Sequence, residues 1–254
     1  MEEKRIIKGQ RFGGCAPVLC VPVVEKTREG ILSCVDTLSR SGVKMIEWRM
    51  DWYEKGTDPV SVTELLQELA PAVKQTVLLA TFRSKGQGGE QEISEETYEA
   101  LNLAAAGSGA ADLVDLEFFS CKDPAAAIAC LQAVGVGVVA SDHDFEKTPS
   151  EEEITRRLGR MHQAGADFSK LAVMPQKKAD VLSLMAGVLQ AKEQYPDSHL
   201  IAMSMGKAGM VSRLMGRWFG SEVIFAAGEK ASAPGQLPYE AAGEVLSKMG
   251  EWIQ

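Results

Sequence analysis

The chain has 254 residues, of which 45% are apolar and 24% are charged, and its formal net charge of −8 gives a pI of about 5.1. This length suits one large α/β barrel or two smaller domains. The acidic balance argues against nucleic acid or an anionic membrane as the main partner, although a few arginines could still form a local pocket for an anionic substrate.

The cysteines and the first residues indicate the cellular compartment. No two of the five cysteines have CxxC spacing, and most lie among apolar residues, where a small buried thiol is the usual state. The opening residues lead into no signal-peptide core, and no apolar run approaches the roughly 18 residues of a membrane span. We therefore expect a cytoplasmic protein with reduced thiols: Cys15, Cys20, Cys34, Cys121 and Cys130.

The chain opens with a weakly alternating segment, residues 4–14, that contains Gly9, Gly13 and Gly14 and predicts a short hairpin or arm. A repeating pattern follows, in which a short apolar run rich in β-formers precedes a polar turn and then a helical pattern. We expect eight strands, at residues 18–24, 43–48, 77–82, 113–116, 136–140, 168–173, 200–203 and 223–226.

The helix starts are marked by capping residues. Asp58 and Asp123 each stand before a proline, which is favoured at the first helical position. Thr148 also precedes a proline, and Glu151 adds a capping-box carboxylate. Ser94 precedes two glutamates and predicts another start. Typical helical stretches are 31–39, 62–69, 125–133 and 179–194.

Strands that alternate with helices at a spacing of about 25–35 residues predict a parallel (β/α)8 barrel. An open doubly wound sheet is the alternative, and it usually carries a glycine-rich phosphate turn after its first strand. The turn at residues 22–26 has no glycine, which favours the barrel. Because no linker or low-complexity segment divides the chain, we expect one domain over residues 1–254.

The predicted strand at residues 168–173 carries a lysine in its middle. If alternate side chains share a face, Phe168, Lys170 and Ala172 point the same way, into the barrel. A buried ammonium must be paired or lose its proton, and a neutral lysine amine is a nucleophile toward carbonyls. The alternative is that Lys170 faces outward and extends its ammonium to water.

In a (β/α)8 barrel the active site lies at the carboxyl ends of the strands. His143 is the one histidine at these predicted ends, since His199 lies at the opposite end and His162 lies on a helix, so no metal cluster is expected. Polar groups gather at seven of the ends: Glu47 and Arg49, Thr81 and Arg83, Asp115 and Glu117, residues 141–144, Lys170, Ser204, and residues 229–236.

This set of side chains suggests covalent imine chemistry. A lysine can condense with a substrate ketone, and the protonated imine then acidifies the neighbouring C–H bond. His143 could move that proton, and arginines such as Arg213 suit a carboxylate. The residues thus predict an imine-forming lyase or aldolase acting on a small keto acid.

Taken together and in order, these segments resemble type I 3-dehydroquinate dehydratase over essentially the whole chain. The resemblance rests on Glu47-Trp48-Arg49, Thr81-Phe82-Arg83-Ser84, Ser141 with His143-Asp144-Phe145, Lys170, Met203-Ser204-Met205-Gly206, Ser212-Arg213, and Ala231-Ser232-Ala233-Pro234-Gly235-Gln236.

The resemblance implies a (β/α)8 barrel, usually a homodimer, in the shikimate pathway. The implied reaction is the loss of water from 3-dehydroquinate to give 3-dehydroshikimate, without a metal or an organic cofactor. Lys170 would form the imine with the C3 ketone. His143 would take the C2 proton and deliver a proton to the departing C1 hydroxyl.

The resemblance also implies a set of substrate-binding residues. Arg213 would bind the substrate carboxylate, and Ser232 with Ala233 would close over the ligand from the loop after the last strand. The other implied contacts are Glu47, Arg49, Arg83 and Gln236 on the ring hydroxyls and carboxylate, and Met203, Met205 and Phe225 as apolar walls.

Two positions depart from the family pattern. Gln87 stands where many members have a glutamate that orients the histidine; an amide can hydrogen-bond an imidazole but cannot stabilise an imidazolium as a carboxylate does. Pro22 stands where some members have a serine that touches the ligand, so it receives no polar role.

Several alternatives remain open at this point. Arg49 and Arg83 could form barrel-mouth salt bridges with Glu47 or Glu117, and Arg213 could be a surface residue. The chain could also be another imine-forming barrel enzyme, such as a class I aldolase with a phosphorylated substrate, or a non-catalytic ligand-binding barrel.

Overall fold

The computed structural model describes residues 5–14 and 16–252, so the opening residues 1–4 and Cys15 lie outside the described part of the chain. Eight parallel strands form one sheet in the order β10-β3-β4-β5-β6-β7-β8-β9. The Glu222 amide donates to the Leu200 carbonyl at 2.8 Å, which brings the two outer strands together. The predicted (β/α)8 barrel is confirmed, with β3 (Val18–Val23), β4 (Met45–Arg49), β5 (Val77–Thr81), β6 (Leu113–Glu117), β7 (Gly137–Asp144), β8 (Phe168–Val173), β9 (Leu200–Ser204) and β10 (Val223–Phe225).

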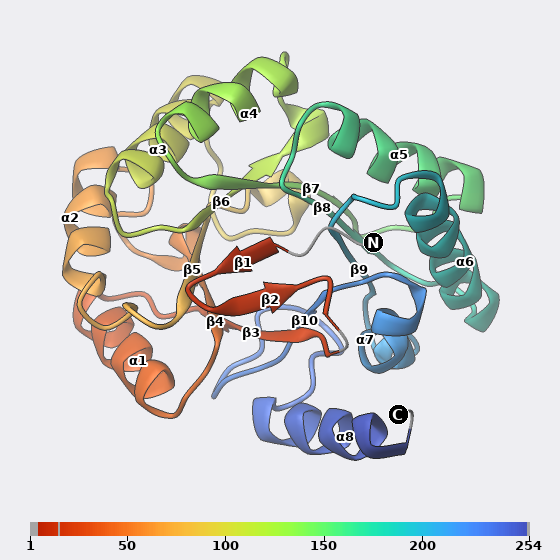
Figure 1. Ribbon diagram of the computed structural model, residues 1–254. Coiled ribbons are helices and arrows are strands. Elements are labelled where there is room, and N and C mark those ends of the chain that lie inside the picture. Colours follow the sequence, from red (N-terminus) through yellow and green to blue (C-terminus); the bar gives the residue numbers. More distant parts are fainter. Residues whose placement is uncertain (1–4, 15, 253–254) are drawn as a thin grey trace.

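The helices surround this barrel (Figure 1). Short 3-10 turns η1 (Met50–Trp52), η2 (Lys85–Gln87), η3 (Phe118–Ser120) and η4 (Gly216–Phe219) lie between strands and helices. The α-helices are α1 (Arg28–Arg40), α2 (Pro59–Leu69), α3 (Glu95–Gly107), α4 (Pro124–Ala133), α5 (Glu151–Gln163), α6 (Lys178–Gln194), α7 (Met210–Met215) and α8 (Tyr239–Trp252). None of the helices in the described residues is long and apolar enough to cross a membrane.

The expected caps are observed with one exception. The Asp58, Ser94 and Asp123 side chains accept backbone hydrogen bonds at the starts of α2, α3 and α4. The cap of α5 is Ser150, whose side chain accepts from the Glu153 amide, so the prediction of Thr148 was wrong. The Thr148 hydroxyl instead donates to the Met174 carbonyl at 3.2 Å, a contact between distant segments that local pattern cannot reveal.

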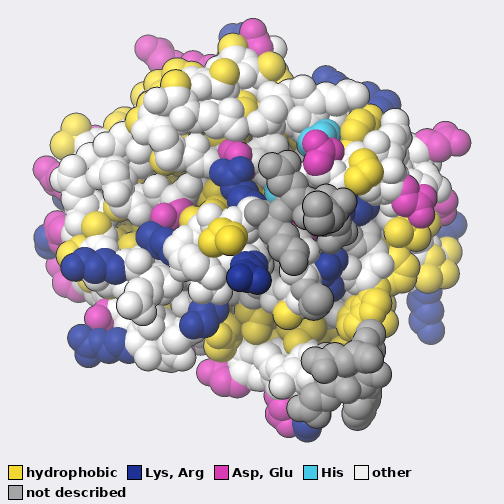
Figure 2. Space-filling view, viewed as in Figure 1, with side chains coloured by type: hydrophobic (Ala, Val, Ile, Leu, Met, Phe, Trp, Pro, Cys, Tyr) yellow, Lys and Arg dark blue, Asp and Glu magenta, His cyan; other side chains and the backbone are white. Residues whose placement is uncertain are grey.

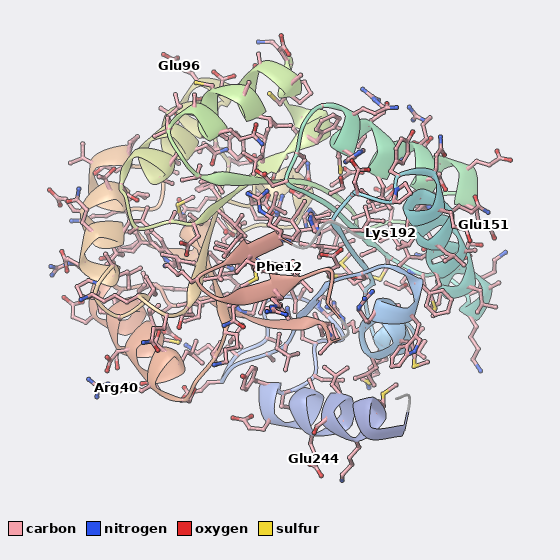
Figure 3. The ribbon with its side chains drawn as sticks, viewed as in Figure 1. Phe12, Arg40, Glu96, Glu151, Lys192 and Glu244 are labelled. Carbon is pink, nitrogen blue, oxygen red and sulfur yellow. The ribbon has the colours of Figure 1, made fainter. Side chains whose placement is uncertain are left out.

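The strand residues alternate between two apolar layers. Phe168 and Ala172 belong to the cluster inside the barrel, together with residues such as Phe12. Leu171 and Val173 belong to a separate cluster that includes residues of α5 and α6. This alternation confirms that Phe168 and Ala172 share the inner face, and Figure 3 shows Phe12 near the barrel centre while Arg40, Glu96 and Glu244 project from the helices.

The predicted hairpin is confirmed as β1 (Arg5–Ile7) paired antiparallel with β2 (Gln10–Phe12). The Phe12 ring packs edge-on against Phe168, with centroids 4.9 Å apart. Arg5 forms an ion pair with Asp167, and Lys8 forms one with Asp112 at 2.7 Å. These two acids directly precede β8 and β6, so the hairpin covers the amino end of the barrel.

The covered end carries positive side chains near its centre, as Figure 2 shows for the same view as Figure 1. Because the hairpin occupies this end and Phe12 fills the space behind it, the carboxyl ends of the strands are left to form a site.

Candidate active site

A cavity lies at the carboxyl ends of the strands and contains about 480 Å³ of space, including the part open to solvent. It brings together every residue that the sequence assigned to binding or catalysis, from strands β4, β7, β8, β9 and β10 and from the segments that follow β5, β7, β9 and β10. The lining residues are Glu47, Arg49, Arg83, Gln87, Gly88, His143, Phe145, Lys170, Ala172, Met203, Met205, Arg213, Phe225, Ser232, Ala233 and Gln236.

Lys170 lies in the middle of β8 with its side chain inside the barrel and only 4% exposed. Its Nζ is 3.2 Å from Glu47 Oε1 and 3.3 Å from Asp115 Oδ2. The Phe225 ring lies beneath it, with the centroid 4.4 Å from Nζ. The outward-facing interpretation is therefore wrong, and the buried ammonium is held between two carboxylates, as a desolvated charge requires.

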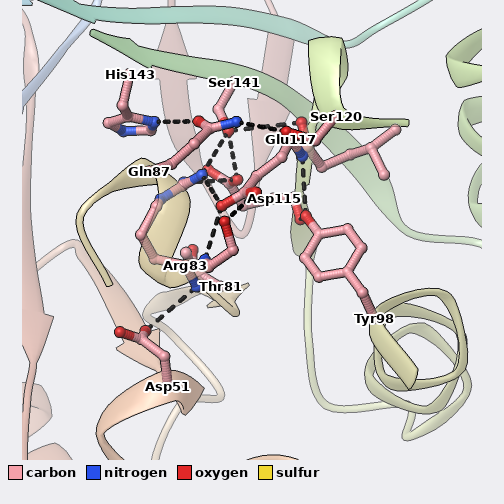
Figure 4. A network of polar contacts seen from close by, with 12 residues as sticks. Asp51, Thr81, Arg83, Gln87, Tyr98, Asp115, Glu117, Ser120, Ser141 and His143 are labelled. Atoms are coloured by element: carbon pink, nitrogen blue, oxygen red, sulfur yellow. Dashed lines mark hydrogen bonds and ion pairs between the residues drawn. The ribbon is translucent and has the colours of Figure 1, made fainter. Parts of the chain in front are cut away.

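Arg83 occupies the base of the cavity with its guanidinium in a network of acids (Figure 4). It donates to Asp115 at 2.7 Å, to Glu117 at 2.8 Å and to Ser141 at 3.1 Å. Burial alone would lower the pKa of Arg83, but Asp115 and Glu117 together raise it above its ordinary value. The salt bridge between Arg83 and Glu117, which was one of the alternatives from the sequence, is therefore present. It holds the guanidinium in place, and Arg83 also lines the cavity.

Asp115 connects Arg83 to Lys170, because its Oδ1 accepts from Arg83 and its Oδ2 accepts from Lys170. Burial would raise the pKa of Asp115, but the two cations outweigh it and hold the pKa below its usual value. Neither Asp115 nor Glu117 lines the cavity, so both support the site from behind.

Arg49 forms a two-pronged ion pair with Asp51, with both N–O distances 2.7 Å. Asp51 is fully buried and also accepts from the Arg83 and Glu90 amides. The partner of Arg49 is therefore Asp51 rather than the Glu47 or Glu117 considered from sequence. Through these two amides, Asp51 joins the turn after β4 to the segment after β5.

Arg213 differs from the other two arginines because it has no ion pair with a carboxylate among the described residues. Its side chain is 3% exposed and donates to the carbonyls of Phe225 at 3.4 Å and Pro234 at 3.3 Å. Burial lowers its pKa to about 10. The surface alternative for Arg213 is wrong, and the cavity wall carries a buried cation whose charge no described residue neutralises.

His143 is the last residue but one of β7, and its imidazole lies against Gln87 (Figure 4). Nδ1 is 3.1 Å from Gln87 Oε1, and Gln87 Nε2 donates to Ser120 Oγ at 3.0 Å. Burial lowers the pKa of His143 well below its ordinary value, and the charges of Arg83, Lys170 and Arg49 lower it further. The imidazole is thus neutral, which suits a proton acceptor.

The loop at residues 229–238 lies over the cavity and is held at several points. Gln236 accepts from the Ser232 amide at 2.9 Å and donates to the Ser232 hydroxyl at 3.0 Å. The Pro234 carbonyl accepts from the Gly206 amide at 3.1 Å, and Lys230 pairs with Glu25 at 2.8 Å. These contacts hold Ser232, Ala233 and Gln236 at the cavity wall.

Comparison with known proteins decides the family. A model of the type I 3-dehydroquinase family matches residues 19–252. The chain belongs to the type I 3-dehydroquinase family. It is therefore an enzyme of the hydro-lyase class.

Individual members of this family are similar in sequence to this chain over nearly their whole length. A 3-dehydroquinate dehydratase of Klebsiella pneumoniae is 45% identical over 241 residues, which cover 94% of this chain and 96% of the relative. One of Listeria innocua is 41% identical and covers 96% of each chain. The crystal structure of the Clostridium difficile type I enzyme, solved with covalently modified comenic acid, has a TM-score of 0.95, 37% identity and full coverage of both chains.

Three residues that line the cavity were not assigned to the site from the sequence: Gly88, Phe145 and Ala172. Ala172 follows Lys170 on the same strand face, so alternation alone could have placed it there. Phe145 belongs to the segment His143-Asp144-Phe145, but no role was predicted for it. It packs on Gly88, where the positive φ of 82° and a Cβ only 2.3 Å from the ring would both oppose a side chain.

Asp144, His199 and His162 each contact neighbouring groups outside the cavity. Asp144 accepts from the amides of Glu146 and Lys147, so it is a loop hydrogen-bond acceptor. His199 pairs with Glu222 at 2.8 Å at the amino end of the barrel, and His162 on α5 lies 3.5 Å from Asp197.

Proposed function

We propose that this chain removes water from 3-dehydroquinate to give 3-dehydroshikimate through an imine on Lys170, with His143 moving the protons. The observation that carries the proposal is the buried Lys170 in one cavity with a neutral His143 and the unneutralised Arg213. The relatives named above are described as 3-dehydroquinate dehydratases, and the Clostridium difficile structure contains a covalently modified ligand.

The proposed reaction begins at the substrate ketone. The free amine of Lys170 attacks C3, and the two protons that the original ammonium nitrogen loses leave with the C3 oxygen as water, which gives a protonated imine. The imine draws electrons from C2, so Nε2 of His143 can remove the C2 proton and leave an enamine. The enamine then expels the C1 hydroxyl, which leaves as water after His143 returns a proton. Water finally hydrolyses the imine and releases Lys170.

Substrate binding follows from the charges on the cavity wall. Arg213 offers guanidinium hydrogens to the substrate carboxylate, because no described acid competes for them. We assign the ring hydroxyls to Glu47 and to the loop residues Ser232 and Gln236, with Ala233 beside them. Met203, Met205 and Phe225 form the apolar walls, and Arg49 and Arg83 contribute positive potential while their hydrogens hold buried acids.

The test is borohydride reduction of the protein with 3-dehydroquinate, followed by intact-mass and peptide analysis. Borohydride reduces an imine to a stable secondary amine, so we expect one ligand-sized mass increase on the peptide that contains Lys170. The conjugated enone product should appear in ultraviolet absorbance in the unreduced reaction. An adduct on the exposed Lys178 or Lys177, which open α6 a few residues later, would instead show non-specific labelling.

Two other functions would give different results. A class I aldolase would bind a phosphorylated ketone better than a quinate-like acid, and a ligand-binding barrel would hold 3-dehydroquinate unchanged. We further propose that the chain is one domain, works as a homodimer in the cytoplasm, and acts on this small molecule without a metal or an organic cofactor.

A further inference from the structure

Lys170 faces two carboxylates, but its contacts with them are long. Its Nζ is 3.2 Å from Glu47 Oε1 and 3.3 Å from Asp115 Oδ2. Hydrogen bonds between an ammonium and a carboxylate are typically about 2.7–2.9 Å long. The two acids therefore compensate the buried charge of Lys170 without binding it tightly. This matters for the proposed function, because imine formation needs the free amine.

The short hydrogen bonds of Asp115 go to other donors. Its Oδ1 accepts from the Ser141 hydroxyl at 2.6 Å and from Arg83 at 2.7 Å. The partners of the serine fix the direction of its bond. Arg83 Nη1 lies 3.1 Å from Ser141 Oγ and can only donate, whereas Asp115, whose pKa is lowered, is ionised and can only accept. The single hydroxyl hydrogen of Ser141 therefore points to Asp115, since the Leu116 carbonyl is 3.5 Å away.

Glu47 is also bound by a buried hydroxyl. Thr81 donates to Glu47 Oε1 at 3.0 Å, and this is the same oxygen that faces Lys170. Thr81 and Ser141 are both 0% exposed and do not line the cavity, so neither would touch a substrate. Each acid that contacts Lys170 thus shares its negative charge with a hydroxyl from the next strand of the barrel, β5 for Glu47 and β7 for Asp115.

We propose that Ser141 and Thr81 are positioning residues for Lys170: their hydroxyls engage the two carboxylates, weaken the hold of these acids on the ammonium, and so favour the free amine. The inference rests on the proposed function. A hydroxyl hydrogen directed at a carboxylate reduces the negative potential that the carboxylate exerts on a nearby cation. Without that hydroxyl, the acid would hold the ammonium more strongly, and Lys170 would keep its proton to a higher pH.

The other groups around Lys170 add no negative charge. Burial lowers the pKa of His143 on β7 and raises that of the Cys20 thiol on β3, so both are neutral. Apart from Glu47, the described residues that line the cavity are cations or carry no charge. The cations are Arg49, Arg83 and Arg213. A change at Glu47 or Asp115 should therefore act directly on Lys170.

The test measures how readily Lys170 reacts as a free amine. A trace of acetic anhydride acetylates unprotonated amines, so peptide mass spectrometry across a pH series gives the pH at which labelling of Lys170 is half-maximal. The exposed Lys178 serves as an internal reference in the same samples. Because this measurement uses no substrate, it does not depend on turnover.

Each variant has a control with the same substitution at the amino end of the barrel. Ser141→Ala is compared with Ser198→Ala, because Ser198 is also buried and its hydroxyl donates to a backbone carbonyl just before β9. Thr81→Val is compared with Thr76→Val, because the buried Thr76 hydroxyl donates to a backbone carbonyl just before β5. Threonine and valine have nearly the same shape, so this second pair keeps the test valid if Ser141→Ala does not fold.

We expect the half-maximal pH of Lys170 labelling to rise by about 0.5–1 pH unit in Ser141→Ala and in Thr81→Val, a part of the roughly 1–3 units that a neighbouring charge contributes. Lys178 and the two controls should not change. Below that pH, kcat/KM for 3-dehydroquinate should fall about threefold to tenfold in both variants, because each pH unit changes the free amine tenfold. Raising the pH should restore it, whereas a structural lesion would lower activity equally at every pH.

The two proposals fail in different ways. If the unmodified chain does not convert 3-dehydroquinate, the proposed function fails, while the labelling still tests the two hydroxyls. If the chain is active and either folded variant, Ser141→Ala or Thr81→Val, labels Lys170 at the same half-maximal pH as its control, the inference is overturned and the function stands.

Discussion

Asp115 accepts a hydrogen bond from Arg83 on one carboxylate oxygen, at 2.7 Å, and from Lys170 on the other, at 3.3 Å. The carboxylate thus connects the proposed nucleophile to the arginine network below it. All three side chains are at least 96% buried, so each charge depends on the others for compensation.

Asp115→Asn tests this dependence. The amide keeps the shape but removes the charge, so we expect the free energy of unfolding to fall by about 3–5 kcal/mol, as for a broken buried pair. Urea unfolding measures the loss. Glu95→Gln, at the exposed ion pair with Lys122, should change it by less than about 1 kcal/mol, and a similar small effect for Asp115→Asn would contradict the network's role.

Lys170→Ala separates binding from chemistry. Without the amine no imine can form, so turnover and borohydride capture should both disappear. Arg213 and the cavity walls remain, so calorimetry should still detect 3-dehydroquinate binding. Robust turnover by this variant would remove the imine from the mechanism.

Gln87→Glu should move the pH dependence of kcat/KM. Burial and then the neighbouring cations keep the pKa of His143 well below its ordinary value, and neutral Gln87 does not oppose them. A carboxylate at Nδ1 should raise the pKa of His143 by about 1–3 units. Because the proposed base must be neutral, activity on the acid side should then be lost at a higher pH than in the unmodified chain. An unchanged acid limb would show that His143 does not limit it.

The same substitution should change how stability depends on pH. The unfolded chain binds the His143 proton more readily than the folded protein does, because the folded pKa is the lower of the two. Folded stability therefore falls as the pH drops below the ordinary histidine value of about 6.5. Gln87→Glu should reduce the contribution of His143 to this fall, which denaturant unfolding at pH 7 and pH 5 can measure.

Arg213→Met should weaken substrate binding and raise the stability of the folded protein. The guanidinium is buried with a pKa lowered to about 10 and has no ion pair with a described carboxylate, so an apolar side chain of similar length should raise the melting temperature. Loss of the charged hydrogen bonds should weaken substrate binding by about 1.5–3 kcal/mol, or roughly 10- to 150-fold in KM. A lower melting temperature together with unchanged KM would contradict both parts.

Phe12→Ala tests the hairpin. Phe12 is 1% exposed and packs on Phe168, so truncation should lower the free energy of unfolding by about 3–5 kcal/mol. Ile6→Ala is the control on the same hairpin, because Ile6 is 59% exposed and should contribute little. Turnover per folded molecule should be retained in both variants, since the site lies at the other end of the barrel.

The strands and the inward direction of Lys170 could be predicted because each depends on local periodicity, which the sequence displays directly. Asp58 and Asp123 were predictable as caps for the same reason. The partners of Arg49, Arg83 and Arg213 were not, because each depends on how the ends of different strands and loops meet. The contact between Gln87 and Ser120 was also beyond the sequence, since the two residues lie 33 positions apart.

The hairpin packs against residues that are made much later, and this affects how the chain folds during synthesis. Arg5 and its partner Asp167 are separated by 162 positions, and Phe12 needs Phe168. At roughly 5–20 residues per second, a ribosome needs about 8–30 s to make the intervening segment. Throughout that interval Phe12 lacks its aromatic partner Phe168 and Arg5 lacks Asp167, so the segment made first cannot complete its native contacts until about 170 residues of the chain have been made.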